Sequence, residues 1–237
     1  ARNAARGFAD AALFEIGPIY LGDGPADQRT VIAALVAPHA ARHWAGAGED
    51  ALFALKGDLT TLLEEIGAPV ASLQLVQGQN RDWWHPGRSG VIGLGPNTLA
   101  TFGEVHPRVL QAMDVKGPAV AFTILIANVP APKVKTPTRP ALAISDLQAV
   151  ERDFAFVVDA RVEALTAVNA AQGADKALIE SVRVFDQFTG DKAEAQMGAG
   201  KKSIALTVRL QPQDKTLTEA EIEAVSAKII EKVTKAT

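Results

Sequence analysis

The sequence contains no cysteine among its 237 residues. This absence excludes disulfide bonds, thiolate nucleophiles and cysteine-based zinc sites together. A chain that folds without disulfides suits a reducing compartment, so we expect a cytoplasmic protein.

Long hydrophobic runs are also missing. The longest apolar stretches, such as residues 119–127, are interrupted by polar residues like Thr123 and are far shorter than the roughly 20 residues of a spanning helix. We therefore expect no contact with a membrane.

The first ten residues contain no initiator methionine and no apolar core of a secretory signal. The chain is expected to be a piece of a longer protein.

An excess of positive charge is absent as well. The chain has 24 lysines and arginines against 27 aspartates and glutamates, a net charge of −3. No overall positive field would attract it to nucleic acid, so any RNA contact must be local. Hydrophobic residues make up 48% of the sequence, which is enough for one large domain or two ordinary ones.

Proline is concentrated in one place. Four of the thirteen prolines fall in residues 130–140, where no helical or strand periodicity is present. This composition is typical of an extended, semi-rigid linker. The sequence therefore predicts one domain in residues 1–129, a linker in residues 130–140 and a second domain in residues 141–237.

The first domain is predicted to be mixed α/β around a mainly antiparallel sheet. Apolar runs at 13–22 and 30–37, each bounded by glycine or proline, indicate neighbouring strands of a buried sheet. Residues 50–67 show the apolar spacing of a helix that packs one face on this sheet and ends at Gly67. Further strands are predicted at 89–95, 98–105 and 119–129, with a short helix at 108–115 after Pro107.

The second domain has a simpler predicted order of strand, helix, strand, strand, helix. The elements are expected at 151–160, 162–172, 181–190, 203–212 and 218–236. Thr218 and Glu221 form the pattern of a capping box at the start of the last helix. This order lacks only a final strand to complete a ferredoxin-like unit, which places the domain in the α+β class.

Three stretches of the second domain resemble the ferredoxin-fold anticodon-binding domain. They are ERDFAFVV at 151–158, VRVFDQFTG at 182–190 and KKSIALTVRLQPQDKTLTEAEI at 201–222. The first domain carries LFEIGP, ALKGDLTTLLEEIG, WWHPGRSGVI and FGEVHPRVLQAMDV in an order similar to the synthetase-like module of bacterial phenylalanyl-tRNA synthetase β chains. The resemblance implies a class II synthetase-like sheet domain followed by a ferredoxin-like domain.

The resemblance also implies partners and a division of labour. Members of this family form α2β2 enzymes in which the α subunit holds the site for phenylalanine and ATP with Mg. The synthetase-like module of the β chain packs in the assembly without performing chemistry. A working class II site needs arginines for the ATP phosphates, and neither LFEIGP nor VIGLGPNT supplies one. We therefore predict no catalytic residue and no bound cofactor in this chain.

The resemblance assigns an anticodon-binding site to the second domain. Phe188 corresponds to the family's stacking aromatic, which is more often tyrosine, and Asp186 corresponds to its acidic partner. Ser203 corresponds to a polar contact, and Ala155 lies on the adjacent strand. An exposed ring can stack on an unpaired base, and a carboxylate can accept hydrogen bonds from a guanine edge. The implied ligand is the anticodon stem-loop of tRNA(Phe). Alternatively, Phe188 closes a small core and Asp186 caps a turn.

Basic residues near this site are candidate phosphate contacts, because a basic strand end beside an open sheet face can neutralise backbone charge. They are Arg152, Lys201, Lys202 and Arg209.

A second hypothesis remains, in which the second domain binds protein without RNA, because residues 144–237 contain 12 basic against 15 acidic residues. A third, that the first domain adenylates an amino acid, is disfavoured by the missing arginines.

Other chemistry-bearing residues are predicted to be structural. His85 and His106 each precede a proline and have no third ligand at helical spacing, so they are expected in turns. His39 and His43 lie in an alanine- and glycine-rich stretch that disfavours a helix and a metal site. Gly93-Leu-Gly95 is too short for a dinucleotide fingerprint. The Trp83–Trp84 pair is predicted to lie at a subunit interface.

Overall fold

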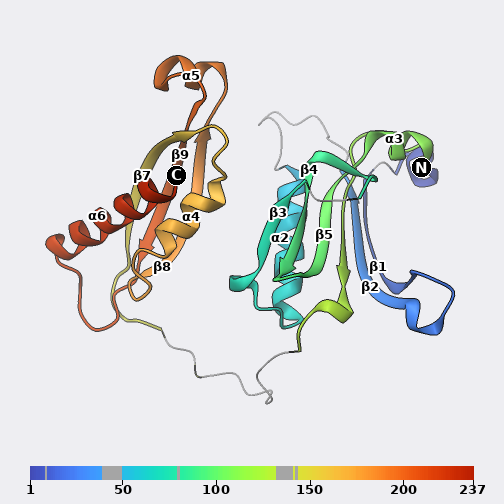
Figure 1. Ribbon diagram of the computed structural model, residues 1–237, viewed down its shortest axis with the longest axis horizontal. Helices are drawn as coiled ribbons and strands as arrows, with labels where there is room; N and C mark the ends of the chain where they lie inside the picture. Colours follow the sequence, from blue (N-terminus) through green and yellow to red (C-terminus); the bar gives the residue numbers. More distant parts are fainter. Residues whose placement is uncertain (9, 39–49, 79–80, 132–140, 142–143) are drawn as a thin grey trace. The chain divides into compact units, whose positions relative to one another are not determined.

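The computed structural model describes residues 1–8, 10–38, 50–78, 81–131, 141 and 144–237 (Figure 1). The chain divides into two compact units, Ala1–Thr138 and Arg139–Thr237. This division falls within the proline-rich segment, most of which lies outside the described residues. The limits of the linker therefore stay a prediction. None of the described helices has the length and hydrophobicity needed to cross a membrane.

The first unit is built on a six-stranded sheet with the order β1-β2-β6-β5-β4-β3. All neighbouring strands are antiparallel, as the sequence predicts. The strands are β1 (Ala11–Tyr20), β2 (Gln28–Ala37), β3 (Gln74–Gln77), β4 (Trp84–Leu94), β5 (Asn97–Val105) and β6 (Val120–Leu125). The short strand β3 was not predicted, because four residues are too few for a clear alternation of apolar and polar side chains.

Helix α2 (Ala51–Glu65) covers one face of this sheet. Asp50 caps it by accepting a 2.9 Å hydrogen bond from the Leu52 amide. Leu59 and Leu63 are fully buried against the sheet. Gly67 follows the helix with a φ of 90°, which confirms the predicted glycine at its end. The smaller helices are α1 (Arg2–Ala5), α3 (Pro107–Ala112) and the single turns η1 (Pro25–Asp27), η2 (Val70–Ser72) and η3 (Ile126–Asn128).

Arg88 connects three elements of the first unit. Its guanidinium donates to Asp50 at the start of α2, with Nη2 and Oδ2 3.0 Å apart, and its Nε donates to Glu104 on β5. The hydrogen bond from the Leu52 amide and the contact with Arg88 hold the pKa of Asp50 below its ordinary value. The arginine of the HPGR stretch thus has a structural role that ties α2 to the sheet.

Strand β1 is far more exposed than its apolar sequence suggests. It is an edge strand that pairs only with β2 in the described sheet. Phe14 is 79% exposed, and Leu13, Ile16 and Tyr20 are also exposed. The prediction of a buried sheet is therefore wrong for β1. The apolar run correctly indicated a strand, but the described residues of this chain do not bury it.

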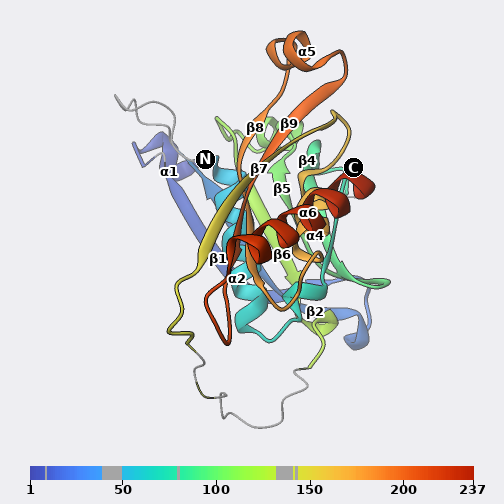
Figure 2. The same cartoon turned by 90° about the vertical axis from the view of Figure 1, so that its left-hand side faces the viewer.

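The second unit contains a three-stranded antiparallel sheet with the order β7-β9-β8. Its elements are β7 (Val150–Asp159), α4 (Ala164–Gln172), β8 (Ile179–Phe188), α5 (Asp191–Met197), β9 (Lys201–Leu210) and α6 (Glu219–Ala236). The predicted α+β order of strand, helix, strand, strand, helix is confirmed. Helix α5 was not predicted, because it is a short insertion between Gly190 and Gly198 at the end of the β8–β9 hairpin (Figures 1 and 2).

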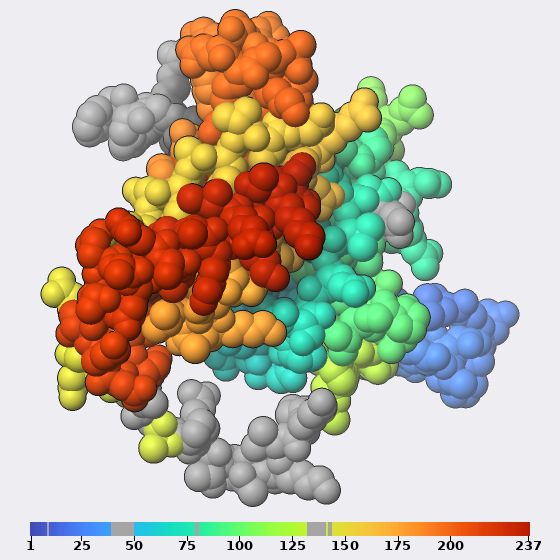
Figure 3. Space-filling view, turned by 60° about the vertical axis from the view of Figure 1, so that its left-hand side comes forward, coloured from blue at the N-terminus to red at the C-terminus, as the bar shows by residue number. Residues whose placement is uncertain are grey.

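Helices α4 and α6 cover one face of the three-stranded sheet, and α6 lies along the surface of the unit (Figure 3). The central strand β9 alternates strictly between buried and partly exposed residues. Every second side chain enters the core, where it meets the apolar stripe of α6. The core-facing residues of β9 are Ile204, Leu206, Val208 and Leu210.

The predicted capping box at the start of α6 is present. The Glu221 carboxylate accepts a 2.9 Å hydrogen bond from the Thr218 amide, and the Glu221 amide donates to the Thr218 hydroxyl at 3.4 Å. Lys215 lies 2.7 Å from the same carboxylate. The contact with Lys215 and the hydrogen bonds from Thr218 lower the pKa of Glu221 from 4.5 to about 2.

This arrangement predicts a specific acid sensitivity. Because the folded-state pKa of Glu221 is depressed, its contribution to stability is present above pH 4.5 and is lost as the pH falls towards 2. A Glu221→Gln variant should be less stable than the parent at pH 7 but should lose less stability between pH 4.5 and 2. Urea unfolding across this pH range measures the difference. Glu223→Gln on the same helix is the matched control, and an equal effect of both substitutions would contradict the role of the capping box.

Candidate nucleic-acid interface

The face of the β7-β9-β8 sheet opposite α4 and α6, here called the open face, carries the predicted recognition residues. Ser203, Ala205, Thr207 and Arg209 of β9 point to this face because they alternate with the buried residues of the same strand. Their side chains are mostly small, so the centre of the open face is a shallow floor. Planar groups such as nucleobases can approach a floor of this kind closely.

Strand pairing brings the four residues assigned by resemblance into two adjacent rows. In one row, Ala155 of β7, Ala205 of β9 and Asp186 of β8 are paired side by side. In the next row, Ser203 of β9 pairs with Phe188 of β8. Neighbouring strands lie about 4.8 Å apart, so these side chains surround one small area. Residues separated by about 50 positions in the sequence thus form one candidate site.

A β-bulge in β8 is what turns two of these residues to the open face. Val184 pairs with Leu206, but the next pair along β9 joins Ala205 to Asp186, so Phe185 is an extra residue. Before the bulge, Val182 and Val184 pack against the core. A regular strand would have directed Asp186 and Phe188 to that same side. The bulge reverses the alternation, as bulges near functional sites commonly do.

The surroundings of Asp186 and Phe188 bear on the alternative structural roles. Asp186 is exposed, and its Oδ1 accepts a 2.9 Å hydrogen bond from the Gln187 amide. This contact engages one carboxylate oxygen locally. Phe188 is partly buried, yet it is not among the residues packed against the core of this unit. Both side chains are therefore placed where a ligand on the open face could meet them.

Two of the four predicted phosphate contacts do not lie on the open face. Lys202 is only 8% exposed and pairs with buried Val158 on the helix-covered side. Arg152 pairs with buried Val208 and approaches Glu219 of α6, with Nη2 and Oε1 3.7 Å apart. The strand register thus directs these two residues away from the open face, and no phosphate contact is proposed for them. The sequence shows a basic cluster, but the direction of each side chain depends on strand register.

The other two predicted phosphate contacts have different environments. Arg209 lies on the open face between two carboxylates, donating through Nε to Glu180 and through Nη1 to Glu151 at 3.4 Å. The hydrogen bond to Glu180 is the main reason that the pKa of Arg209 is raised. Its charge is thus already balanced by the protein. Lys201 is exposed and belongs to the same alternation as Ser203, so it stays a candidate.

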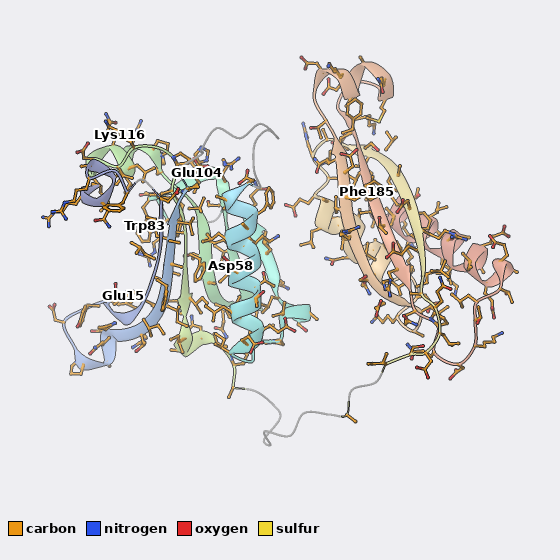
Figure 4. The ribbon with its side chains drawn as sticks, turned by 180° about the vertical axis from the view of Figure 1, so that it is seen from behind. Glu15, Asp58, Trp83, Glu104, Lys116 and Phe185 are labelled. Carbon is orange, nitrogen blue, oxygen red and sulfur yellow. The ribbon has the colours of Figure 1, made fainter. Side chains whose placement is uncertain are left out.

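Sequence reasoning missed two further residues of the open face, Arg183 and Phe185. Both are exposed, and Phe185 is 51% exposed (Figure 4). The alternation of Ser181, Val182, Arg183 and Val184 could have placed Arg183 on the face opposite the valines. The exposure of Phe185 follows from the bulge, and the sequence alone does not predict this bulge.

The two histidines that precede prolines were expected in turns, but His85 lies within β4 and His106 is the N-cap residue of α3. The Nδ1 of His85 accepts a hydrogen bond from the Gly87 amide at 3.2 Å, and that of His106 caps α3 by accepting from the Arg108 amide at 3.1 Å. In the described part of the chain, no three histidine, aspartate or glutamate side chains are grouped to hold a metal ion. His39 and His43 lie outside the described residues.

The two neighbouring tryptophans separate into different environments. Trp84 is 4% exposed, so it belongs to the interior of the first unit and the interface prediction is wrong for it. Trp83 is 47% exposed, with the Arg81 guanidinium 5.3 Å above its ring. Only Trp83 retains a surface that a partner could contact.

The fold defines a two-unit α+β protein in which an antiparallel-sheet module is joined to a ferredoxin-like module whose three-stranded sheet is covered by helices on one face. Residues 1–126 match the family described as "Phenylalanyl tRNA synthetase beta chain CLM domain". Residues 145–237 match the "Ferredoxin-fold anticodon binding domain". The chain belongs to the phenylalanyl-tRNA synthetase β chain family, which confirms the resemblance seen in its motifs.

Several curated relatives match the whole chain. It is 69% identical over 239 residues to the phenylalanine–tRNA ligase beta subunit of Cereibacter sphaeroides and 59% identical over 241 residues to that of Ruegeria pomeroyi. It is 51% identical over 239 residues to the corresponding subunit of Rhodospirillum rubrum. Each match covers 100% of this chain but 29% of the relative. The chain therefore spans less than a third of the length of these relatives.

The opposite orientations of Lys201 and Lys202 generate a matched pair of variants. Lys201→Met should reduce the slope of log affinity for tRNA against log salt concentration by about 0.7, the value for one lost phosphate contact to a single strand. Lys202→Met should leave this slope unchanged, because the side chain is buried on the other side of the sheet. Binding measurements with the complete β chain in its assembled enzyme provide both slopes. Equal slopes for the two variants would show that sheet orientation does not select the contact.

Proposed function

We propose that this chain contributes anticodon binding and subunit assembly to a phenylalanine–tRNA ligase, which charges tRNA(Phe) with phenylalanine at the expense of ATP. The observation that carries the proposal is the strand register of the second unit. It gathers Asp186, Phe188, Ser203 and Ala155 on one open face. The match of this unit to an anticodon-binding family supports RNA as the ligand, in preference to a protein.

Each residue of this group has a distinct role in the proposed binding. The Phe188 ring stacks on an unpaired anticodon base. The exposed Asp186 carboxylate, on the adjacent row, accepts hydrogen bonds from the edge of that base. The Ser203 hydroxyl supplies a polar contact, and the small side chain of Ala155 leaves room for the base. A phenylalanine at position 188 retains stacking but lacks the hydroxyl of the more frequent tyrosine.

The first unit has an assembly role in this proposal. Strand β1 exposes a row of large apolar side chains, which is costly in water and typical of an interface. The partner is the α subunit of an α2β2 enzyme, which holds the catalytic site and uses ATP and Mg. The module described here supplies no catalytic residue. The lack of cysteine is consistent with a cytoplasmic location for the enzyme.

Truncation of the two side chains should weaken tRNA binding. Phe188→Ala removes base stacking worth about 1–3 kcal/mol. Asp186→Ala removes hydrogen bonds to a charged acceptor worth about 1.5–3 kcal/mol. Titration of the assembled enzyme with tRNA(Phe), and with the same tRNA carrying an altered anticodon, measures both losses. Phe188→Tyr is the control that retains the ring, and it should bind at least as tightly as the parent.

The proposed site is contradicted if both alanine variants bind tRNA(Phe) with parental affinity. It is also contradicted if the preference for the correct anticodon survives in both. Circular dichroism of the variants checks that the fold is intact, as expected for two side chains outside the core.

The assembly role predicts that a charge on β1 prevents association. Phe14→Asp places a carboxylate on the most exposed large apolar residue of this strand. Because a charge at the core of an interface is costly, the variant β chain should fail to form the complex with the α subunit. Analytical ultracentrifugation measures the mass of the complex. Phe53→Asp, on the exposed side of α2, is the matched control, and loss of assembly in both variants would remove the special role of β1.

A further inference from the structure

Beside the candidate anticodon site, the open face continues along β8 towards Arg183. Arg183 pairs with Thr207 of β9, which pairs with Asp153 of β7. This row directly follows the row of Ala155, Ala205 and Asp186. Phe185, the extra residue of the bulge, lies between Arg183 and Asp186 on β8.

Phe185 has the exposure and the position on a strand that are typical of a residue that contacts a ligand. It is 51% exposed, although a phenyl ring gains stability from burial. It belongs to an edge strand, and bulges at such edges commonly direct a side chain for function. A ring held in this way by a rigid strand can stack on a base with little loss of side-chain freedom.

Arg183 differs from Arg209 on the open face and from Arg152 on the helix-covered side of the sheet. Arg209 is balanced by Glu180 and Glu151, and Arg152 is paired with Glu219. Within the described residues, Arg183 has no ion pair. The nearest carboxylate in its row belongs to Asp153, which already accepts a 2.7 Å hydrogen bond from the Thr207 hydroxyl. The positive charge of Arg183 is therefore available to a phosphate.

The spacing of these side chains matches a short run of single-stranded RNA. Side chains two residues apart on a strand are separated by about 6.6 Å, so Arg183 and the bulged Phe185 lie about one such step from each other. An extended nucleotide can place its base and its phosphate across a step of this size. The small residues of β9 leave the path between the two rows open.

We propose that the open face contains a second nucleotide subsite, in which Phe185 stacks on a base and Arg183 binds a phosphate. This subsite holds the anticodon-loop nucleotide adjacent to the one at Phe188 and Asp186, and it rests on the function proposed above. The first subsite reads the identity of a base through Asp186. The second accepts any base, because stacking and phosphate contacts carry no sequence code. It sets the path of the loop across the sheet.

The test uses the complete β chain in its assembled ligase, with anticodon stem-loop RNA as the probe at several salt concentrations. Phe185→Ala should weaken binding about 5- to 150-fold, the range for one lost base stack, and Phe185→Tyr should retain parental affinity. Arg183→Gln should reduce the salt slope by about 0.7. Lys232→Gln, an exposed cation on α6 away from the open face, is the matched control and should leave the slope unchanged.

An RNA in which one nucleotide next to the stacked anticodon base is abasic identifies the occupant. The parent enzyme should lose affinity for this RNA, whereas Phe185→Ala should lose no more than it has already lost. If Phe188→Ala weakens binding but Phe185→Ala and Arg183→Gln do not, the second subsite is overturned and the proposed function stands. If none of the three variants weakens binding, the proposed function falls with it. If Phe185→Ala changes only the mass of the assembly, a protein surface covers the ring and the subsite is likewise overturned.

Discussion

The alternation of side chains along β9 is the constraint on which the second unit depends. Because β9 is central, its core-facing side chains fix the register of both β7 and β8. A slip by one residue would move Leu206 and Val208 out of the core and bring Ala205 and Thr207 into it. The burial of four large aliphatic side chains therefore secures the positions of the polar residues on the other face. Stability and the candidate site are properties of the same strand.

The bulge at Phe185 interrupts this regularity within β8, and the proposed function depends on it. Bulges cost pairing in the ladder, since the extra residue has no partner. This bulge lies where β8 begins to direct the Asp186 carboxylate and the Phe188 ring to the open face instead of the core. The first unit shows a comparable division. Arg88 ties α2 to the sheet at one side, while β1 at the other edge leaves apolar side chains uncovered by the described residues.

Much of this architecture could be predicted from the sequence. Apolar periodicity and capping residues gave the order of elements in the second unit, and the motifs gave the family. The orientation of individual cations could not be predicted, because Lys201 and Lys202 are chemically identical neighbours that only strand register separates. The exposure of β1 was also hidden, since an apolar strand has the same composition whether its own chain or a partner buries it. Phe185 was not predicted as a residue of the open face, because a bulge depends on how two separate strands pair.

The central claim is that RNA binds on the face of the three-stranded sheet opposite α4 and α6. Alanine methyl groups report on this directly, because Ala155 and Ala205 lie on the open face whereas Ala167 and Ala171 are buried on the core-facing side of α4. Methyl NMR of the complete β chain with alanine labels, titrated with the anticodon stem-loop, compares the two pairs. We expect shifts at Ala155 and Ala205 and none at Ala167 and Ala171. Binding that leaves the open-face methyl groups unchanged would contradict the account.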